Sequence, residues 1–343
     1  MFLFFHRDCF TPLVTTKFRQ ALEPHINQLS NGPRRGALKP SGGLLVAFSG
    51  GSGSSVLLDL VHRTYCANVV GGDELKGGKE HPRRNRVWKR IHVCYVETSD
   101  IFPEARPVFA LSFLPPPPPP LILLTCTQTN DRTARIREVI ARYEGCEFIP
   151  VRMQDAFDRS WWERVSRGAA SSPTELSVDL HGEGLCDRPS DASSESLTFL
   201  LDSLTALRAH LCSLPTPTAI QSTLSTLTRL LLLYTAYSIG ASHLVLGTSL
   251  TSLSISLISS ISQGGGFVLP QAIQEEWIPP FIEQAPGAAT SWRGEVRLIR
   301  PLRDVGMKEC TAWIWWNQLS VVGKQRIPIS ERTIGNLTKG SYT

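Results

Sequence analysis

Seven glycine and serine residues are the part of this chain best suited to bind a phosphate group. They lie between an apolar run and a helical pattern. They are Ser49, Gly50, Gly51, Ser52, Gly53, Ser54 and Ser55, here called the phosphate loop. The apolar residues 44–48 predict a buried strand before it, and the glycines allow a tight turn. The helix expected after the loop would point unpaired backbone N–H groups at a bound phosphate. No Lys-Ser or Lys-Thr pair closes the loop, so it is not a Walker A motif, and an ordinary strand-to-helix turn is the alternative.

Two further groups of polar residues follow later strands. After an expected strand at 243–247 comes a polar loop, here called the second loop, whose hydroxyl groups could bind phosphate. Its candidate contacts are Gly247, Thr248, Ser249, Thr251 and Ser252. Arg300 and Arg303 flank the turn after a strand at 296–299, where a nucleotide would lie at the carboxyl end of a sheet. A structural salt bridge is the alternative role for these two arginines.

The elements that must position these residues predict an α/β fold with a parallel sheet. A strand at 44–48, a helix at about 55–65 and a strand at 91–96 form a βαβ unit. Further strands are expected near residues 146–151, 243–247 and 296–299. Helices are expected at residues 15–22 (ended by Pro24), 131–140, 197–211, 218–239, 253–263 and 307–318. Gly240 stands where a helix C-terminal cap belongs, and Gly264 where the next helix stops.

The predicted organisation is an approach segment at 1–40, an α/β domain at 41–320 and a tail at 321–343. Two insertions interrupt the domain. Residues 108–125 contain six consecutive prolines, and residues 166–196 are rich in Ser, Gly, Asp and Pro. Polyproline cannot join a β-ladder, so the first insertion is either a docking ligand for an aromatic groove or a segment foreign to the fold.

Composition narrows the class of protein. The 343 residues carry a net charge of +5, and basic residues crowd the stretch 76–90. Those that could contact a phosphate backbone, if the stretch is more than a solvated loop, are Arg83, Arg84, Arg86, Lys89 and Arg90. The eight cysteines form no CxxC pair, which favours reduced thiols in the cytosol over a disulfide scaffold or an intact zinc site. No apolar stretch reaches the roughly 20 residues of a membrane-spanning helix.

The phosphate loop lies close to the Ser-Gly-Gly-x-Asp-Ser loop of the ATP pyrophosphatase (PP-loop) superfamily, with Gly53 in place of the Asp. Four segments in order resemble the cytoplasmic tRNA 2-thiolation protein 2 family, whose members are partner subunits of the cytosolic thiouridylase. The segments are residues 10–19, 49–55, 246–252 and 300–309. The resemblance covers most of the chain outside the two insertions.

This resemblance implies a PP-loop α/β fold, with helices on both faces of a parallel sheet, and a role in wobble-uridine 2-thiolation. The substrates would be lysine, glutamine and glutamate tRNAs, which carry 5-methoxycarbonylmethyl-2-thiouridine. In the family's reaction, ATP adenylates the uracil C2 oxygen, and a sulfur nucleophile displaces AMP. Sulfur comes from a thiocarboxylated ubiquitin-like carrier of the urmylation pathway, and the expected partners are the active thiouridylase subunit and tRNA, with no membrane. The basic stretch and the two arginines are then candidate tRNA contacts.

Compared with active enzymes of the superfamily, this chain keeps the glycine and serine residues of the phosphate loop and lacks most of the residues that take part in the reaction. Ser52 and Gly53 replace the Lys-Asp of the active paralogue. The second loop has neither the His nor the two Asp of the active Gly-His-x-x-Asp-Asp loop, and those acids would attract the phosphate-bound cation. The resemblance therefore predicts a non-catalytic half of a heterodimer with no catalytic residue of its own, in which ATP and Mg²⁺ would bind through the partner.

The termini depart from the family pattern, which has a cysteine-rich zinc module at the front and further cysteines near the end. Here Cys9 stands alone at the front and Cys310 is the last cysteine, so we expect no metal ligands and a chain clipped at both ends. Two other functions stay open at this point. One is an independently active ATP-dependent tRNA sulfurtransferase or adenylyltransferase. The other is a nucleotide-binding interaction protein that has no tRNA role and docks through its polyproline segment.

Overall fold

The computed structural model describes residues 7–26, 42–66, 87–88, 90–101, 131–167, 203–262, 264, 273–278 and 296–323. The polyproline segment, nearly all of the Ser-rich insertion and the tail beyond residue 323 lie outside these residues. So do four of the basic residues predicted as phosphate contacts, namely Arg83, Arg84, Arg86 and Lys89.

Six strands form one sheet, in the order β3-β2-β1-β4-β6-β5. The strands are β1 (Gly43–Ala47), β2 (Ile91–Glu97), β3 (Cys146–Arg152), β4 (Ala241–Leu246), β5 (Glu276–Trp277) and β6 (Arg297–Ile299). All neighbours are parallel except β5, which pairs antiparallel with β6. The expected parallel α/β sheet is confirmed for β1 to β4 and β6, and the short antiparallel β5 is an addition that the sequence pattern did not predict.

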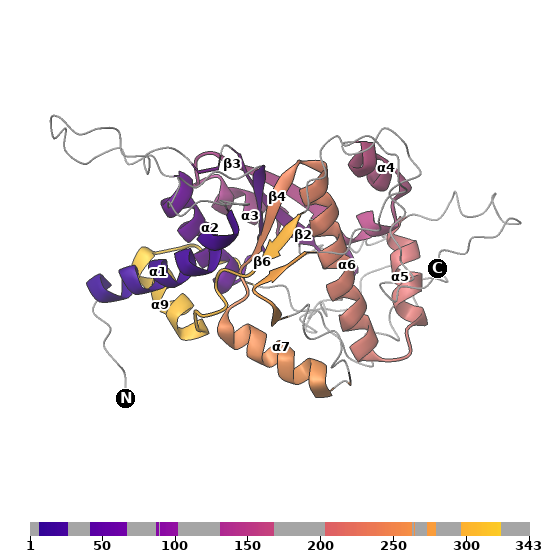
Figure 1. Ribbon diagram of the computed structural model, residues 1–343. Helices are drawn as coiled ribbons and strands as arrows, with labels where there is room; N and C mark the ends of the chain where they lie inside the picture. The colour runs from indigo at the N-terminus through magenta and orange to yellow at the C-terminus, as the bar shows by residue number, and fades with distance from the viewer. Residues whose placement is uncertain are drawn as a thin grey trace, which may run out of the picture.

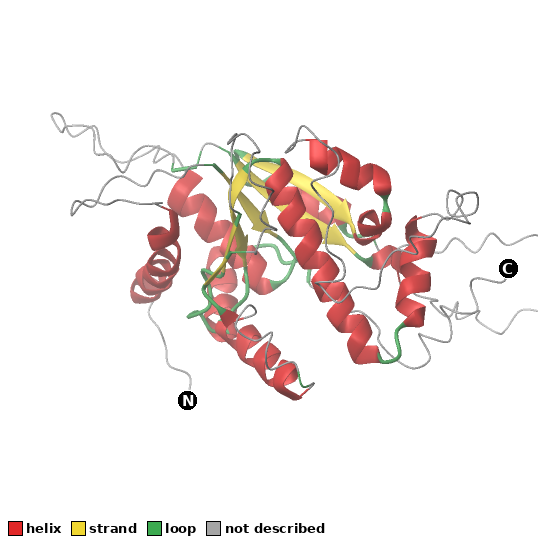
Figure 2. Cartoon of the chain, turned by 45° about the vertical axis from the view of Figure 1, so that its right-hand side comes forward, coloured by secondary structure: helices red, strands yellow, loops and turns green. Residues whose placement is uncertain are grey.

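Helices cover both faces of the sheet (Figures 1 and 2). One face carries α1 (Arg7–Ile26), α2 (Ser52–Val61), α3 (Thr133–Ile140) and α9 (Met307–Asn317). The other carries α4 (Arg159–Arg167), α5 (Ser203–Ser213) and α6 (Pro217–Ser238). Short turns η1 (His62–Cys66, a π-helix), η3 (Ser99–Ile101) and η4 (Met153–Phe157) continue or join these elements, and α7 (Leu250–Ser262) follows β4.

The central strand β1 shows why the sheet needs two helical layers. Leu44 and Val46 are buried in the apolar cluster that holds α1, α2 and α9, whereas Leu45 is buried in the cluster that holds α5 and α6. Successive side chains of a strand point to opposite faces, so an uninterrupted apolar run must be covered on both sides. Each such fully buried side chain contributes about 1.5–3 kcal/mol relative to an exposed one.

The first helix is longer than the sequence pattern predicts. It begins at Arg7 and ends at Ile26, so the expected stop at Pro24 is wrong. Buried Phe10, Val14 and Phe18 lie on one face of α1, and this packing against the sheet-side cluster outweighs the two prolines within the helix. The helix caps were predicted correctly: Gly240 and Gly264 have φ of 66° and 78°, as expected for residues that end α6 and α7.

Candidate functional site

The strand order places the phosphate loop and the second loop side by side. From β1 the chain winds outward through β2 and β3, and then returns to build β4 and β6 on the other side of β1. The topological switch point therefore lies between β1 and β4, which pair in parallel from Gly43 to Ala47. In open α/β sheets ligands bind beyond the carboxyl ends of the two strands at this point. The phosphate loop follows β1 there, and the second loop follows β4.

The phosphate loop is a tight turn in which the serine hydroxyl groups bond within the loop. Gly50 has a φ of 74°, which favours glycine. The hydroxyl groups of Ser54 and Ser55 both donate to the carbonyl oxygen of Gly51, at 2.9 and 3.1 Å, and Ser49 donates to Ser54 at 3.3 Å. Ser54 and Ser55 are buried. What the loop can offer an anion is therefore the backbone N–H groups of residues 52–54, because they precede the first hydrogen bond of α2, from Ser55 to the Gly51 carbonyl oxygen at 3.0 Å.

Gly53 and Gly247 meet backbone to backbone, and this contact fills the place where a side chain at position 53 would lie. A Cβ atom added to Gly53 would stand 2.1 Å from the carbonyl oxygen of Gly247. A Cβ atom added to Gly247 would stand 2.7 Å from the backbone of Gly53 and Ser54. Real Cβ atoms essentially never come this close to other heavy atoms. The second loop thus rests directly on the first turn of α2, and no residue larger than glycine fits at either position.

The hydroxyl groups of the second loop cap helices. Ser249 is fully buried, and its hydroxyl oxygen accepts from the backbone N–H of Ser252 at 3.3 Å, at the start of α7. The Thr251 hydroxyl oxygen accepts from the backbone N–H of Met307 at 3.1 Å, at the start of α9. The Ser52 hydroxyl group donates to the Met307 sulfur at 3.0 Å. These contacts join α2, α7 and α9 around the two loops.

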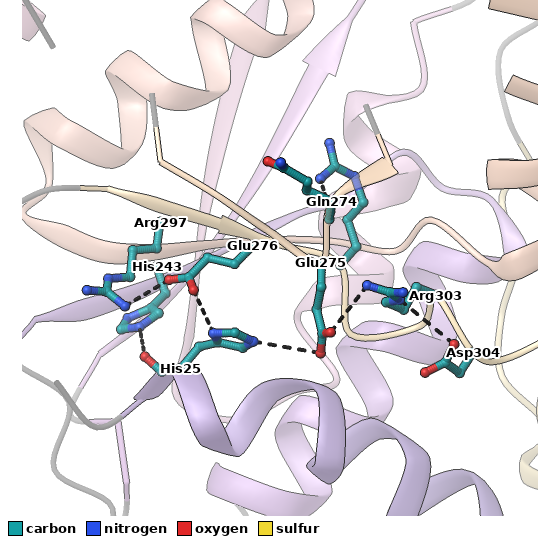
Figure 3. A network of polar contacts seen from close by, with 9 residues as sticks. His25, His243, Gln274, Glu275, Glu276, Arg297, Arg303 and Asp304 are labelled. Atoms are coloured by element: carbon teal, nitrogen blue, oxygen red, sulfur yellow. Dashed lines mark hydrogen bonds and ion pairs between the residues drawn. The ribbon is translucent and has the colours of Figure 1, made fainter. Parts of the chain in front are cut away.

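Arg300 and Arg303, predicted as phosphate or tRNA contacts or as salt-bridge partners, have protein partners in the structure. The buried Arg300 donates from Nη1 to the carbonyl oxygen of Gln274 at 2.7 Å, and burial lowers the pKa of its guanidinium to about 10. Arg303 Nη1 lies 3.2 Å from a carboxylate oxygen of Glu275 (Figure 3). The same carboxylate group lies 3.7 Å from Nε2 of His25, at the end of α1. Arg303 thus forms an ion pair, Arg300 donates to a backbone carbonyl oxygen, and the tRNA or phosphate role of both remains a prediction.

Of the five basic residues predicted as contacts in the stretch 76–90, Arg90 is the one that the structure describes. It is exposed, and its backbone carbonyl oxygen accepts from Leu44 at the beginning of β1. Because β1 and β2 are parallel, Arg90 lies at the amino end of the sheet, opposite the phosphate loop. The structure therefore brings the phosphate loop and second loop together and places Arg90 at the other end.

Two features beside the phosphate loop were not predicted as part of the site. The first is Glu97, a buried residue at the carboxyl end of β2, whose carboxylate accepts backbone N–H groups from Thr98, Ser99 and Arg132 at 2.9 Å each. The second is Gly323, whose backbone N–H donates to the Gly50 carbonyl oxygen at 2.8 Å while its own carbonyl accepts from Arg132 at 3.1 Å. The chain after α9 thus lies against the phosphate loop, and only Glu97, at the end of a strand, carried a sequence signal.

The two loops do not fit a magnesium–ATP complex of this chain's own. Neither loop contains a carboxylate, the ligand type that Mg²⁺ prefers. The acid of α2, Asp59, is buried and is bonded to Arg63 at 2.9 Å and to the Trp313 indole N–H at 2.8 Å. Among the described residues no group of three or more His, Cys, Asp and Glu is placed to hold a metal ion. Nor is any helix of the described ranges long and apolar enough to cross a membrane.

Comparisons with known proteins give relatives that share one name. Cytoplasmic tRNA 2-thiolation protein 2-B of Xenopus laevis is 33% identical over 310 residues, covering 89% of this chain and 53% of that protein. Cytoplasmic tRNA 2-thiolation protein 2 of Xenopus tropicalis is 30% identical, covering 94% and 56%, and that of Bos taurus is 26% identical, covering 93% and 54%. The chain therefore spans about half the length of the curated relatives it matches.

No protein-family model matches the chain. A solved structure, the U34-tRNA thiolase NcsA from Methanococcus maripaludis with its [4Fe-4S] cluster, is similar with a TM-score of 0.47 and 12% sequence identity. That match covers 97% of this chain and 71% of the thiolase.

Proposed function

We propose that this chain, which belongs to the cytoplasmic tRNA 2-thiolation protein 2 family, is a non-catalytic subunit of a cytoplasmic tRNA thiolation complex. Its partner would be the active thiouridylase subunit, and the complex would thiolate the wobble uridine of lysine, glutamine and glutamate tRNAs. Sulfur would come from a thiocarboxylated ubiquitin-like carrier. The names of the relatives support the pathway, and the two loops at the switch point support the non-catalytic role.

The contact between Gly53 and Gly247 carries the non-catalytic part of the proposal. An adenylating enzyme of this superfamily needs the Asp of the phosphate loop and the acids of the second loop to handle the magnesium-bound phosphates. Here a glycine stands in place of the first acid, and the second loop closes onto it, so that a Cβ atom would lie 2.1 Å from Gly247. Restoring one side chain therefore would not restore the site.

We further propose that an α/β domain at residues 41–320 is completed by α1 of the approach segment, whose apolar side chains share its core. We also propose that the exposed Arg90 and the basic residues before it contact tRNA. Lys and Arg side chains bind the phosphate backbone without reading sequence, so such contacts would weaken steeply with added salt. A patch at the amino end of the sheet would hold tRNA away from this chain's own degenerate loops and leave the reacting base to the partner.

The proposal is tested by reconstitution with the active subunit. The chain alone, the active subunit alone and the co-purified pair are each incubated with ATP, unmodified tRNA and a sulfur donor. We expect a stable pair, and AMP release and 2-thiouridine formation that are higher in the pair than in the active subunit alone. We expect neither product from the chain alone. If the chain alone releases AMP and pyrophosphate, the non-catalytic assignment is wrong.

A further inference from the structure

Helix α7 carries an apolar face that the fold leaves exposed. Its residues, Leu250–Ser262, include no charged side chain, and Leu253 is the residue that the helix buries. Ile255, Ile258 and Ile261 keep 64%, 67% and 57% of their surface exposed. In Figure 1 α7 lies below the sheet and begins beside α9. Single exposed apolar residues are ordinary, but a row of them on one helix marks an interaction surface.

The exposed apolar face of α7 is wide. The three isoleucines are spaced three residues apart and form one ridge, and the half-exposed Leu250 lies on the same side of the helix. A helix turns by about 100° per residue, so these four side chains cover about 140° of its circumference. Two helices that pack side by side share only a narrower seam. The width of the face therefore favours a groove that encloses the helix over a single partner helix.

The serine residues within this face do not prevent its burial. The Ser254 hydroxyl group donates to the Leu250 carbonyl oxygen at 3.0 Å, and the Ser262 hydroxyl group donates to the Ser259 carbonyl oxygen at 2.8 Å. Burying a hydroxyl group is costly when it loses its hydrogen bond to water and gains no other. Because these two hydroxyl groups bond within their own helix, they keep their hydrogen bonds when water leaves.

The fold holds α7 in place at its first turn. Isoleucine and serine are weak helix formers, and a helix of this length is marginal on its own. Here the Leu250 backbone N–H donates to the Val305 carbonyl oxygen at 2.9 Å, and the Thr251 hydroxyl oxygen accepts from the Met307 backbone N–H at 3.1 Å. The helix is thus anchored beside the second loop before any partner binds, which lowers the entropy cost of binding.

We propose that α7 docks into an apolar, uncharged groove of the active thiouridylase subunit. The inference rests on the proposed function, which requires such a subunit, and it assigns the surface that binds it. The absence of charge on α7 matches the cores of protein interfaces, from which charged residues are depleted. Docking there would hold the active subunit at the carboxyl end of the sheet, because α7 follows β4. Arg90, at the amino end, would stay open to tRNA.

The exposed area of α7 argues against a second copy of this chain as the occupant. Each of the four exposed apolar side chains offers on the order of 100 Å², which gives roughly 400 Å² for the face. A stable interface buries about 800 Å² on each partner. Packing α7 against α7 of a second copy would therefore supply about half of the area required. A groove that also contacts the flanks of the helix can supply the rest.

The test measures the affinity of the full chain for the purified active subunit by isothermal titration calorimetry. A double variant with Ile255→Ser and Ile258→Ser should bind at least about 100-fold more weakly, because each central anchor of an interface accounts for roughly tenfold in affinity or more. The matched control combines Ile255→Leu with Ile258→Leu. It keeps the face apolar and should bind within about threefold of the wild-type chain.

Two further measurements on the chain alone identify other occupants. The melting temperature of the serine variant should stay within about 2 °C of wild type, because both isoleucines are already exposed. A fall of about 5 °C or more would show that the chain itself covers this face, and would overturn the inference. Sedimentation should give a monomer for the wild-type chain. A wild-type dimer that the serine variant abolishes would assign α7 to a second copy and likewise overturn it.

The binding experiment also separates this inference from the proposed function. If the serine variant binds the active subunit as tightly as the wild-type chain, the docking surface is wrong and the proposed function stands. If the wild-type chain does not bind the active subunit at all, the proposed function fails, and the assignment of α7 fails with it.

Discussion

Replacing Gly53 by alanine adds a single methyl group at the point where α2 meets the second loop. In an open helix this change would stabilise the protein by up to about 1 kcal/mol, because alanine is the better helix former. Here the new Cβ atom would lie 2.1 Å from the Gly247 carbonyl oxygen, and the obstacle is backbone that cannot rotate away. The second loop would have to retreat by roughly 1 Å, at the cost of about 1–3 kcal/mol that is usual for overpacking.

Gly43→Ala is the matched control, because it makes the same chemical change where there is room. A Cβ atom at Gly43 would meet its nearest neighbours at 3.8 Å, an ordinary van der Waals distance. We therefore expect this variant to unfold at or slightly above the wild-type temperature. Gly53→Ala should unfold at a temperature about 5 °C lower than Gly43→Ala, since 1 kcal/mol shifts the melting temperature of a larger domain by about 2–4 °C.

The assay is thermal or urea unfolding of the three proteins, together with ATP cleavage by Gly53→Asp. The aspartate variant adds a buried carboxylate to the same clash, so it should be less stable than Gly53→Ala and should still release no AMP. If Gly53→Ala is as stable as Gly43→Ala, the loops are not in contact as described. If Gly53→Asp gains ATP cleavage, the second loop does not close the site.

Three further predictions concern buried polar groups. Burial lowers the pKa of His92 and His243, so around and below about pH 6.5 the unfolded chain binds more protons than the folded chain. The free energy of unfolding, measured in urea, should therefore fall from about pH 7.5 to about pH 5.5. An unchanged free energy of unfolding over this range would contradict the prediction. Trp313→Phe removes the donor to Asp59 and should lower the free energy of unfolding by about 1–3 kcal/mol, measured in urea, and a neutral effect would refute the role of that bond. Glu97→Ala leaves several backbone N–H groups without their acceptor and should lower the free energy of unfolding by about 3 kcal/mol or more in the same assay. Glu97→Gln should lower it less, because the amide oxygen still accepts hydrogen bonds.

Most of the sheet could be predicted because its longer strands contain apolar runs of the right length. The expected strand at 44–48 corresponds to β1, and those near 91–96 and 146–151 correspond to β2 and β3, each within a residue or two at its ends. Helix ends were harder to predict, since tertiary packing carries α1 past Pro24. The helix α4 was missed because it is short and adjoins the Ser-rich stretch, although Trp161 and Val165 are spaced to share one buried face.

The candidate site was predictable in its residues and unpredictable in its contacts. The position of Gly53 after a glycine pair, and of Gly247 after a strand, was visible in the sequence. That these two glycines touch depends on β1 and β4 being neighbours, which is a property of the whole topology. The hydrogen bond from Gly323 to the phosphate loop likewise joins segments that no local pattern connects.

The most direct test of the proposed role is the 2-thiouridine content of lysine, glutamine and glutamate tRNAs, measured by nucleoside mass spectrometry after deletion of the gene. Expression of the wild-type chain in the deletion strain provides the comparison. We predict that deletion abolishes 2-thiouridine, that the unthiolated nucleoside accumulates, and that the wild-type chain restores the modification. Unchanged 2-thiouridine in the deletion strain would contradict the assignment to tRNA thiolation.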